Sequence, residues 1–371
     1  MAKYTVKKLD VSQVGVRQES FRILYSAFNN SSDRRSATDK LPKNPNIFKK
    51  LEQTECFGVF QGASQIGFGI LRDLKNNTYR ISHVAVDPLY RHDGAGGKLV
   101  RAMIRSVAAR GGGTILLQTD PGKKNERKWF MSMGFAPAKR GTDDGVSLTL
   151  TVDDKILFYL NLCDFLDRYP DLVYGFYAVD EDPYCDTYPT ALVLMRPFRC
   201  SENESDERYH EFLLREKEHL NTVLRSVSNH LNDLGIQNLP IPLHRYDVDE
   251  SLARKVAAMR AGLGWLGKND RVVHRVYGSR TVSCRIYLNA DLPVNTHIRR
   301  NHCGDCRRCV DACPVECLKN KKWSTKIPRK DIIDEAACLE YRSRSYSQTG
   351  RYTECDRCVR CCPGKKERKP T

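Results

Sequence analysis

Residues 303–314 read CGDCRRCVDACP, a C-x2-C-x2-C-x3-C-P run, and a second cysteine-rich run, ECDRCVRCCP, occupies residues 354–363. Three closely spaced thiolates on one loop can hold three irons of a cubane cluster, whereas the cysteine before the proline serves a second cluster. A zinc site needs only four ligands, usually from two separated C-x2-C pairs. The triple spacing followed by Cys-Pro therefore predicts a module with two 4Fe-4S clusters.

The second run can be read in two registers. Cys355, Cys358 and Cys361 would repeat the spacing of the first three cysteines, whereas Cys362 would complete a C-x2-C-x3-C-P pattern. We favour Cys362, because the proline then marks the remote ligand in both halves. Cys317 and Cys361 are left over. The predicted sets are Cys303, Cys306, Cys309 and Cys362 for one cluster, and Cys338, Cys355, Cys358 and Cys313 for the other.

Composition supports this metal chemistry. Ten of the 15 cysteines lie after residue 300. The N-terminus has no apolar signal segment and no apolar run approaches a membrane span, so we expect a cytoplasmic protein without a membrane partner. Disulfides are rare in such a reducing compartment, and clustered cysteines there indicate metal or redox chemistry.

The net charge of +16 is unevenly distributed. Residues 299–371 hold 19 Lys and Arg against 10 Asp and Glu, which gives +9 for this fifth of the chain. Two cubane clusters with four thiolates each carry about −4 together, so an excess of positive charge remains. A basic surface of this kind favours a polyanionic partner such as nucleic acid.

Strands and helices alternate along the 371 residues, which indicates two or three domains of α/β (α+β) architecture. Residues 1–50 are polar and lack clear periodicity. Strands are expected at 55–72 (two, joined by a turn), 79–87, 115–118, 146–152, 172–179, 190–196 and 281–288, and helices at 97–109, 125–133, 153–168, 206–234 and 250–260. We place domains at 1–152, 153–298 and 299–371, the last with a basic tail.

A glycine-rich loop, LYRHDGAGGKL (89–99), follows the strand VAVDP (84–88) and precedes a helix. Backbone amides of such a loop and the positive end of the helix dipole form an anion site. Glycine lets the backbone approach a phosphate closely, and Arg91 can add a charge-assisted hydrogen bond.

Together with NERKWFMSMGF (125–135), this loop resembles the GNAT superfamily of N-acetyltransferases. The resemblance implies a mixed-sheet domain that binds acetyl-CoA or another acyl-CoA. Trp129 and Phe130 leave no phenol where many members have a tyrosine acid, and Glu126 and His83 are candidate bases. The implied cofactor-binding residues are Arg91, His92, Asp93, Gly94, Ala95 and Gly96 at the pyrophosphate, Val84 and Val86 along the pantetheine arm, and Asn125.

The segment AGLGWLGKN (261–269) contains G-x-G-x-x-G, but it follows a helix and not a strand, so a dinucleotide site is excluded. With the cysteine runs it resembles epoxyqueuosine reductase and its relatives over residues 155–363. That family implies a nitroreductase-like α/β domain with cobalamin, and a ferredoxin-like double-cluster domain fed by a low-potential donor such as a ferredoxin or flavodoxin. Its reaction removes an epoxide oxygen from a modified tRNA base.

The family's proton-donor aspartate falls in RYDVDESLARK (245–255), where Asp249 or Asp247 is the candidate catalytic residue. A solvated helix N-cap is the more common role of such residues, because DVDES before a helix is typical of a cap. The segment after Pro363 differs from the family, and so does the absence of helical repeats before Thr371. Both differences weaken the case for tRNA as the substrate.

We therefore expect an iron–sulfur oxidoreductase joined to a GNAT-type acyltransferase. Two alternatives stay open: an electron-transfer module for a partner enzyme, and an acetyltransferase whose clusters are structural or sense redox state.

Overall fold

The computed structural model describes residues 4–29, 54–91, 93–138, 146–180, 184–243, 249–324, 326–349 and 355–363. The chain divides into two compact units, residues 1–170 and 171–371, which are considered separately below. Within the described ranges no helix combines the length and the apolar character that crossing a membrane requires.

The first unit is built on a seven-stranded sheet in the order β1-β2-β3-β4-β5-β7-β6. Every neighbouring pair is antiparallel except β4 and β5, which run parallel. This mixed sheet agrees with the predicted α/β fold. Its elements are β1 (Thr5–Leu9), α1 (Val14–Asn29), β2 (Thr54–Gln61), β3 (Ser64–Asp73), β4 (Thr78–Val86), η2 (Pro88–Tyr90), α3 (Ala95–Ala108), β5 (Gly113–Thr119), α4 (Lys124–Met131), β6 (Ala136–Pro137), β7 (Val146–Val152) and α5 (Asp154–Leu166).

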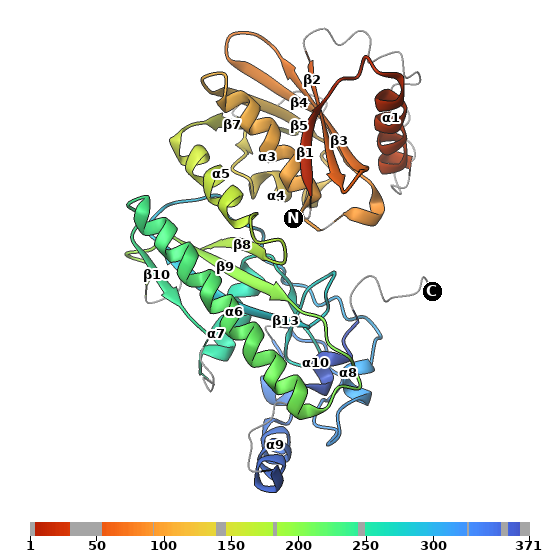
Figure 1. The fold of residues 1–371 in the computed structure, drawn as a ribbon, viewed down its shortest axis with the longest axis vertical. Coiled ribbons are helices and arrows are strands. Elements are labelled where there is room, and N and C mark those ends of the chain that lie inside the picture. Colours follow the sequence, from red (N-terminus) through yellow and green to blue (C-terminus); the bar gives the residue numbers. More distant parts are fainter. Residues whose placement is uncertain are drawn as a thin grey trace. The chain divides into compact units, whose positions relative to one another are not determined.

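Helices α1 and α3 cover opposite faces of this sheet (Figure 1). Ile70 of β3 belongs to the same buried cluster as Ile23 of α1. A side chain at the neighbouring Gly69 would instead contact Met103 of α3. Successive residues of a strand face opposite sides of a sheet, so the two helices bury different faces. The pattern of residues 1–50 did not predict α1.

Strands β4 and β5 separate part of the way along their length. Their parallel pairing runs from Thr78 opposite Thr114 to Ile81 opposite Leu117 and then stops. The antiparallel register between β3 and β4 shifts at the same level, where Ser82 is the extra residue. The remainder of β4, up to Val86, therefore presents one unpaired backbone edge beside β5.

Helix α5 closes the first unit. The side chain of Asp153 caps it by accepting a hydrogen bond from the Ile156 N–H. Beyond its last turn, Asp167 forms ion pairs with Lys98 (3.3 Å) and Arg101 (2.9 Å) of α3. These contacts attach to the first unit a helix that the sequence analysis assigned to the start of the second domain.

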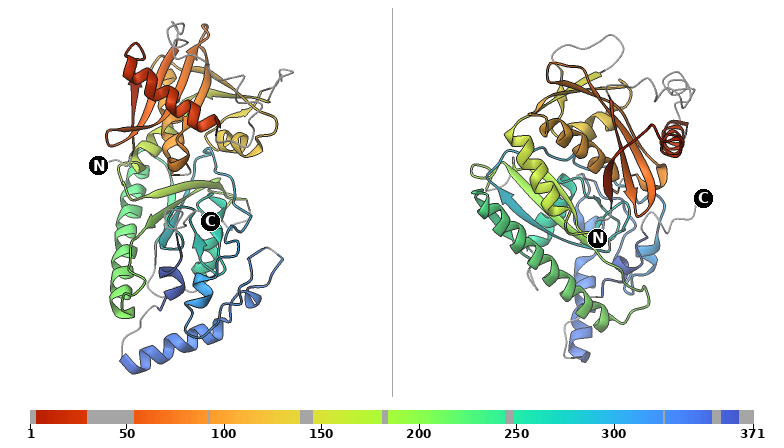
Figure 2. Two further views of the ribbon diagram at one scale, coloured as in Figure 1. Left: turned by 90° about the vertical axis from the view of Figure 1, so that its right-hand side faces the viewer. Right: turned by 45° about the horizontal axis from the view of Figure 1, so that its top comes forward.

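The second unit contains an antiparallel four-stranded sheet in the order β10-β13-β9-β8. Its helices α6 and α7 lie on opposite faces (Figures 1 and 2). Ala191, Val193 and Met195 of β9 share one cluster with Ala257 and Ala258 of α7, and the alternate residues of β9 face α6. The elements up to β13 are β8 (Val173–Ala178), β9 (Thr190–Pro197), α6 (Asp206–Asp233), β10 (Asn238–Ile241), α7 (Asp249–Arg260), β11 (Trp265–Leu266), β12 (Val272–Val273) and β13 (Thr281–Leu288).

The cysteine-rich part belongs to the same compact unit as this sheet. It is mostly irregular and carries three short helices and one longer one, α9 (Glu335–Thr349, 15 residues). The short ones are α8 (Arg308–Asp311), η3 (Arg329–Asp331) and α10 (Arg357–Arg360). The separate domain that we placed at 299–371 is therefore packed against residues 171–298 and does not stand apart.

The core of the first unit gives a stability prediction. Ile104 of α3 is fully buried against the sheet. Ile104→Ala should lower the free energy of unfolding by roughly 2–5 kcal/mol, and Ile104→Val by about 0.5–1.5 kcal/mol, because each leaves a cavity of different size. Urea unfolding followed by circular dichroism measures both. Val14→Ala, at a 59% exposed site of α1, is the control and should change stability by less than about 0.5 kcal/mol.

Candidate iron–sulfur and acyl-CoA sites

The two Cys-Pro runs fold alike. Each forms a short helix, α8 or α10, and these two helices pack against each other. The residue that ends each helix, Ala312 in the first run and Cys361 in the second, donates its N–H to the first and third carbonyls of that helix. Cys361 thus occupies the place of Ala312, and Cys362 occupies the place of Cys313.

The first predicted ligand set surrounds one small pocket, which is also lined by Lys268, Asn269 and Pro363. Its four thiols are Cys303, Cys306, Cys309 and Cys362. Cys361 is buried and does not line this pocket, although its thiol acts electrostatically on Cys309; its Sγ lies 3.7 Å from the Cys358 carbonyl oxygen. Burial and the neighbouring thiols raise the pKa of Cys309 to about 12. The thiolate form is therefore stable there only when a bound cation such as iron compensates its negative charge.

The second predicted set lines a different and larger cavity, of about 530 Å³. Cys317 also lines this cavity, with its Sγ 3.3 Å from Cys313 Sγ. In the described ranges no three His, Cys, Asp or Glu side chains converge on a point as around a single ion. A cubane takes each thiolate on a different iron, so its ligands surround a pocket instead, and both sets fit that geometry. The thiols of the second set are Cys313, Cys338, Cys355 and Cys358.

The glycine-rich segment 261–269 holds the two cysteine runs in place. Trp265 Nε1 donates to Cys303 Sγ over 3.4 Å. Lys268 Nζ donates to the Cys306 carbonyl, and Asn269 Nδ2 donates to the Cys358 carbonyl. The segment therefore contacts the backbone or sulfur of both runs. Spacing alone predicted none of these contacts.

An ion-paired group lies on the wall of the 530 Å³ cavity. Lys255 Nζ donates to Asp270 Oδ2 over 2.8 Å, and Arg329 Nε donates to the same oxygen over 2.9 Å. Burial and the nearby Arg271 lower the pKa of Lys255, although Asp270 opposes them. Sequence reasoning missed this group, and the Lys-Asn-Asp that follows the last glycine was the available signal. Of the two predicted catalytic residues, Asp247 lies outside the described residues, and only the backbone of Asp249 is described.

In the first unit, the glycine-rich loop meets α3 at Gly94, the N-cap, which has a φ of 89°. A Cβ at Gly94 would have no atom within 4 Å, so space is open in front of the helix amides that an anion would approach. The carboxylate of Asp93 accepts a 2.7 Å hydrogen bond from the Tyr4 hydroxyl. The cradle expected at Asp93, Gly94, Ala95 and Gly96 thus has the backbone geometry for a pyrophosphate.

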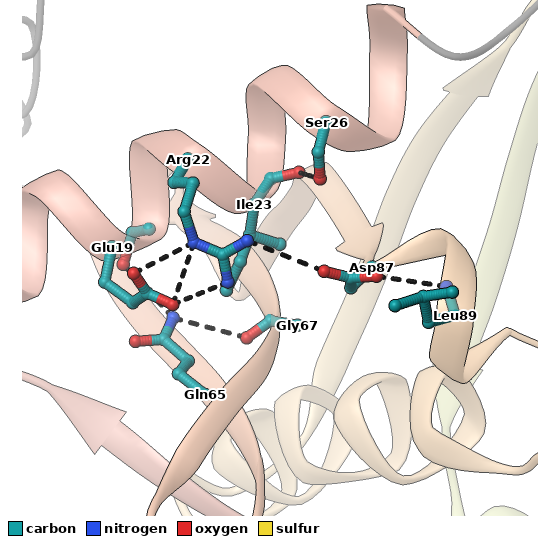
Figure 3. Close-up of polar contacts among 9 residues, drawn as sticks. Glu19, Arg22, Ile23, Ser26, Gln65, Gly67, Asp87 and Leu89 are labelled. Atoms are coloured by element: carbon teal, nitrogen blue, oxygen red, sulfur yellow. Dashed lines mark hydrogen bonds and ion pairs between the residues drawn. The ribbon is translucent and has the colours of Figure 1, made fainter.

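Contacts with α1 hold this loop from the other side. Arg22 of α1 pairs with Asp87, whose side chain accepts from the Leu89 N–H (Figure 3). The Arg91 guanidinium donates to the carbonyls of Val86 and Ala27, at 2.9 Å each. Arg91 therefore ties the loop to β4 and α1, and its bond to a phosphate stays a prediction.

The remaining predicted cofactor residues surround the separation of β4 from β5. Val84 and Val86 are half-buried on the unpaired part of β4. A side chain at Gly96 would approach the Trp129 ring at 3.2 Å, so the indole covers the start of α3. Asn125 is exposed on α4. His92 lies outside the residues that the structure describes.

His83 is the stronger of the two candidate bases. It pairs across the sheet with Ile70, which faces α1, so both side chains lie on that face. Its buried Nδ1 has no hydrogen-bond partner among the residues that the structure describes. Burial and Arg72 lower the pKa of His83, which keeps the imidazole neutral near pH 7. Glu126 is exposed on α4.

Comparison with known proteins agrees with both sites. Residues 20–135 match the model of the acetyltransferase (GNAT) family, and residues 302–365 match the 4Fe-4S double cluster binding domain. The chain thus joins a GNAT acetyltransferase domain to a 4Fe-4S double cluster domain.

Its curated relatives are epoxyqueuosine reductases. The one from Synechocystis sp. is 34% identical over 112 residues, 29% of this chain and 34% of that protein. The one from Pseudomonas aeruginosa is 30% identical over 127 residues, 32% of this chain and 33% of that protein. The chain thus spans about a third of the length of these relatives.

Solved structures similar to this chain are N-acetyltransferases. The ribosomal-protein-S18-alanine N-acetyltransferase of Escherichia coli is 19% identical, with a TM-score of 0.33 over 40% of this chain and 94% of that chain. The PaiA N-acetyltransferase of Thermoplasma acidophilum in complex with coenzyme A is 12% identical, with a TM-score of 0.34 over 40% of this chain and 98% of that chain.

The two possible registers of the second run predict different iron contents for two cysteine variants. Cys362→Ala should remove one cluster and halve the iron per chain, because Cys362 completes the first pocket. Cys361→Ala should keep the full iron and sulfide content, because Cys361 takes the place of an alanine. Iron and sulfide analysis of the two anaerobically purified variants measures this. Halved iron in the Cys361 variant, with full iron in the Cys362 variant, would reverse the register.

Proposed function

We propose that residues 171–371 form an iron–sulfur oxidoreductase that passes electrons through two 4Fe-4S clusters to an acceptor in the 530 Å³ cavity. The observation that carries this proposal is the separation of the cysteines into two sets. One set surrounds a small pocket, and the other opens into a cavity of the size that single organic ligands occupy. Low-potential electrons delivered by a ferredoxin or flavodoxin would reach the acceptor through the second set.

The acceptor that we propose is the epoxide of a modified tRNA base, by similarity to the epoxyqueuosine reductases. Conversion of an epoxide to an alkene consumes two electrons and two protons and releases one water. Lys255 lines the cavity and carries a proton that the reaction can use. The basic excess of the chain suits a nucleic acid.

Anaerobic purification and assay test this function. The chain should hold about eight iron and eight sulfide, and with reduced flavodoxin it should convert epoxyqueuosine in tRNA to queuosine. Cys355→Ala should lose one cluster and all turnover, because Cys355 belongs to the set at the cavity. A corrinoid absorbance band would show whether cobalamin is bound.

Cys185→Ala, at a half-buried cysteine outside both sets, is the matched control and should retain iron and turnover. A chain with full clusters that reduces a partner enzyme but neither tRNA nor any small epoxide would be an electron-transfer module instead. Zinc without sulfide would remove the oxidoreductase proposal.

We also propose that residues 1–170 bind acyl-CoA and transfer its acyl group to an amine. The unpaired edge of β4 and the open cradle at Gly94 support binding of the cofactor. His83, on the α1 face of the same strand, supports removal of a proton from the attacking amine. As the C–N bond forms, the amine proton passes to the imidazole; the C–S bond breaks, CoA leaves as a thiolate, and the imidazolium returns its proton to that thiolate through solvent.

The pH dependence of acyl transfer tests the role of His83. A base must be neutral to act, and the pKa of His83 is lowered, so the rate should be level at neutral pH. It should fall only as pH drops below the ordinary histidine pKa of about 6.5. His83→Gln should lower kcat by roughly 10²- to 10⁴-fold and remove the fall of the rate at low pH. Free CoA thiol released over a panel of amines with acetyl-CoA measures the rate.

Glu126→Gln is the control and should leave the rate unchanged. Calorimetry should find acetyl-CoA binding unaltered in the His83 variant, because the cradle lies in the loop before α3. An unchanged acid limb in His83→Gln would exclude His83 as the base, and no heat with the unmodified chain would exclude the cofactor itself.

A further inference from the structure

The glycine-rich segment 261–269 lies against the first cysteine set in a fixed conformation. Its strand β11 pairs with β12, with Trp265 opposite Val273. A Cβ at Gly264 would lie 2.6 Å from the Val273 carbonyl oxygen, and one at Gly267 would lie 2.6 Å from the Val273 side chain. The glycines are thus required for close pairing of the backbone, and they set the positions of the residues between and after them.

One of these residues is Trp265, whose indole N–H points at a predicted cluster ligand. Nε1 lies 3.4 Å from Cys303 Sγ, and the side chain is 4% exposed. Asn301 fixes the two partners, because it donates to the Leu266 carbonyl and accepts from the Cys303 N–H. The ring also packs edge-on against His302. The N–H···S contact is therefore held by both chain segments.

The second residue is Lys268, which is 3% exposed. Its Nζ donates to the Cys306 carbonyl over 3.0 Å and to Asn320 Oδ1 over 2.9 Å. Lys268 lines the same pocket as the four thiols of the first set. A buried ammonium group in this position is close to the charge that a cluster would carry.

We propose that Trp265 and Lys268 are positioning residues that raise the reduction potential of the cluster held by the first set. One-electron reduction adds a negative charge to a cluster. A hydrogen bond to a ligand sulfur and a nearby cation both stabilise the more negative form, and both are known determinants of cluster potentials. The two groups act on the first cluster alone, since both lie at its pocket.

The effect should be absent at the second cluster. Cys338 lies outside both cysteine runs and is the remaining ligand of the second set. Its neighbours are Arg342, Arg271 and the thiols of Cys317 and Cys313, and not an indole. This inference rests on the proposed presence of two clusters, but not on the proposed substrate. Metal analysis and potentials measured on the chain alone distinguish its failure from failure of the tRNA reaction.

The test is a mediated dithionite titration of the anaerobic holoprotein, followed by electron paramagnetic resonance. Cys362→Ala, which should lack the first cluster, identifies which of the two reduction steps belongs to it. Trp265→Phe and Lys268→Gln should each shift the midpoint of that step to a lower potential and leave the other step unchanged. Iron and sulfide content should stay at the unmodified value.

Trp323→Phe is the matched control, since Trp323 lies in the same cysteine-rich region and lines neither of the two cysteine pockets. It should move neither step. An unchanged first step in Trp265→Phe at full iron content, or an equal shift of both steps, would overturn the proposal.

A second variant separates the N–H group from the shape of the ring. Benzothienylalanine at position 265 keeps the indole shape and lacks the N–H, so it should shift the first step as phenylalanine does. Loss of the first cluster from this variant, or a potential equal to that of the unmodified chain, would assign Trp265 a packing role and overturn the proposal.

Discussion

The exchange of the fourth cysteine between the two runs is the constraint on which the second unit depends. Cys362 lies with the first three cysteines of the other run, and Cys313 lies with Cys338, Cys355 and Cys358. Neither run can complete a ligand set by itself, so segments about fifty residues apart must fold together. The packing of α8 against α10 brings them together, and binding of metal at such crossed sites adds its free energy to folding.

The ligand sets could be predicted because their information is local. Within each run the cysteine spacings and the closing proline lie within a dozen residues, and the structure places the predicted cysteines around two spaces, with Cys317 also at the second. Contacts such as Trp265 to Cys303 and Lys268 to Cys306 could not be predicted. Each joins residues 38 positions apart, and no pattern in the chain marks the pairing.

The elements of the first unit show the same limit. Strong alternation placed β7 at residues 146–152, and the apolar spacing of α3 identified that helix to within two residues. The buried residues of α1, Ser20, Ile23, Leu24 and Ala27, do follow the i, i+3, i+4, i+7 spacing of a helix, and the sequence analysis missed the helix because it treated residues 1–50 as one polar stretch. The contacts of Arg91 differ from the predicted phosphate contact for a related reason. Its charge suggested a phosphate ligand, whereas the fold places two carbonyls within its reach.

The unequal surroundings of the two cysteine sets give a direction to electron transfer. An acceptor can enter the 530 Å³ cavity, which the second set lines, but the small pocket around the first set has no comparable space. Under the proposed function, electrons leave from the second cluster, and the first acts as the relay from a donor. A relay works best when its potential is fixed independently of the substrate. The glycine-rich segment provides that independence, because it holds Trp265 and Lys268 against the first set, while Lys255 and Asp270 face the cavity.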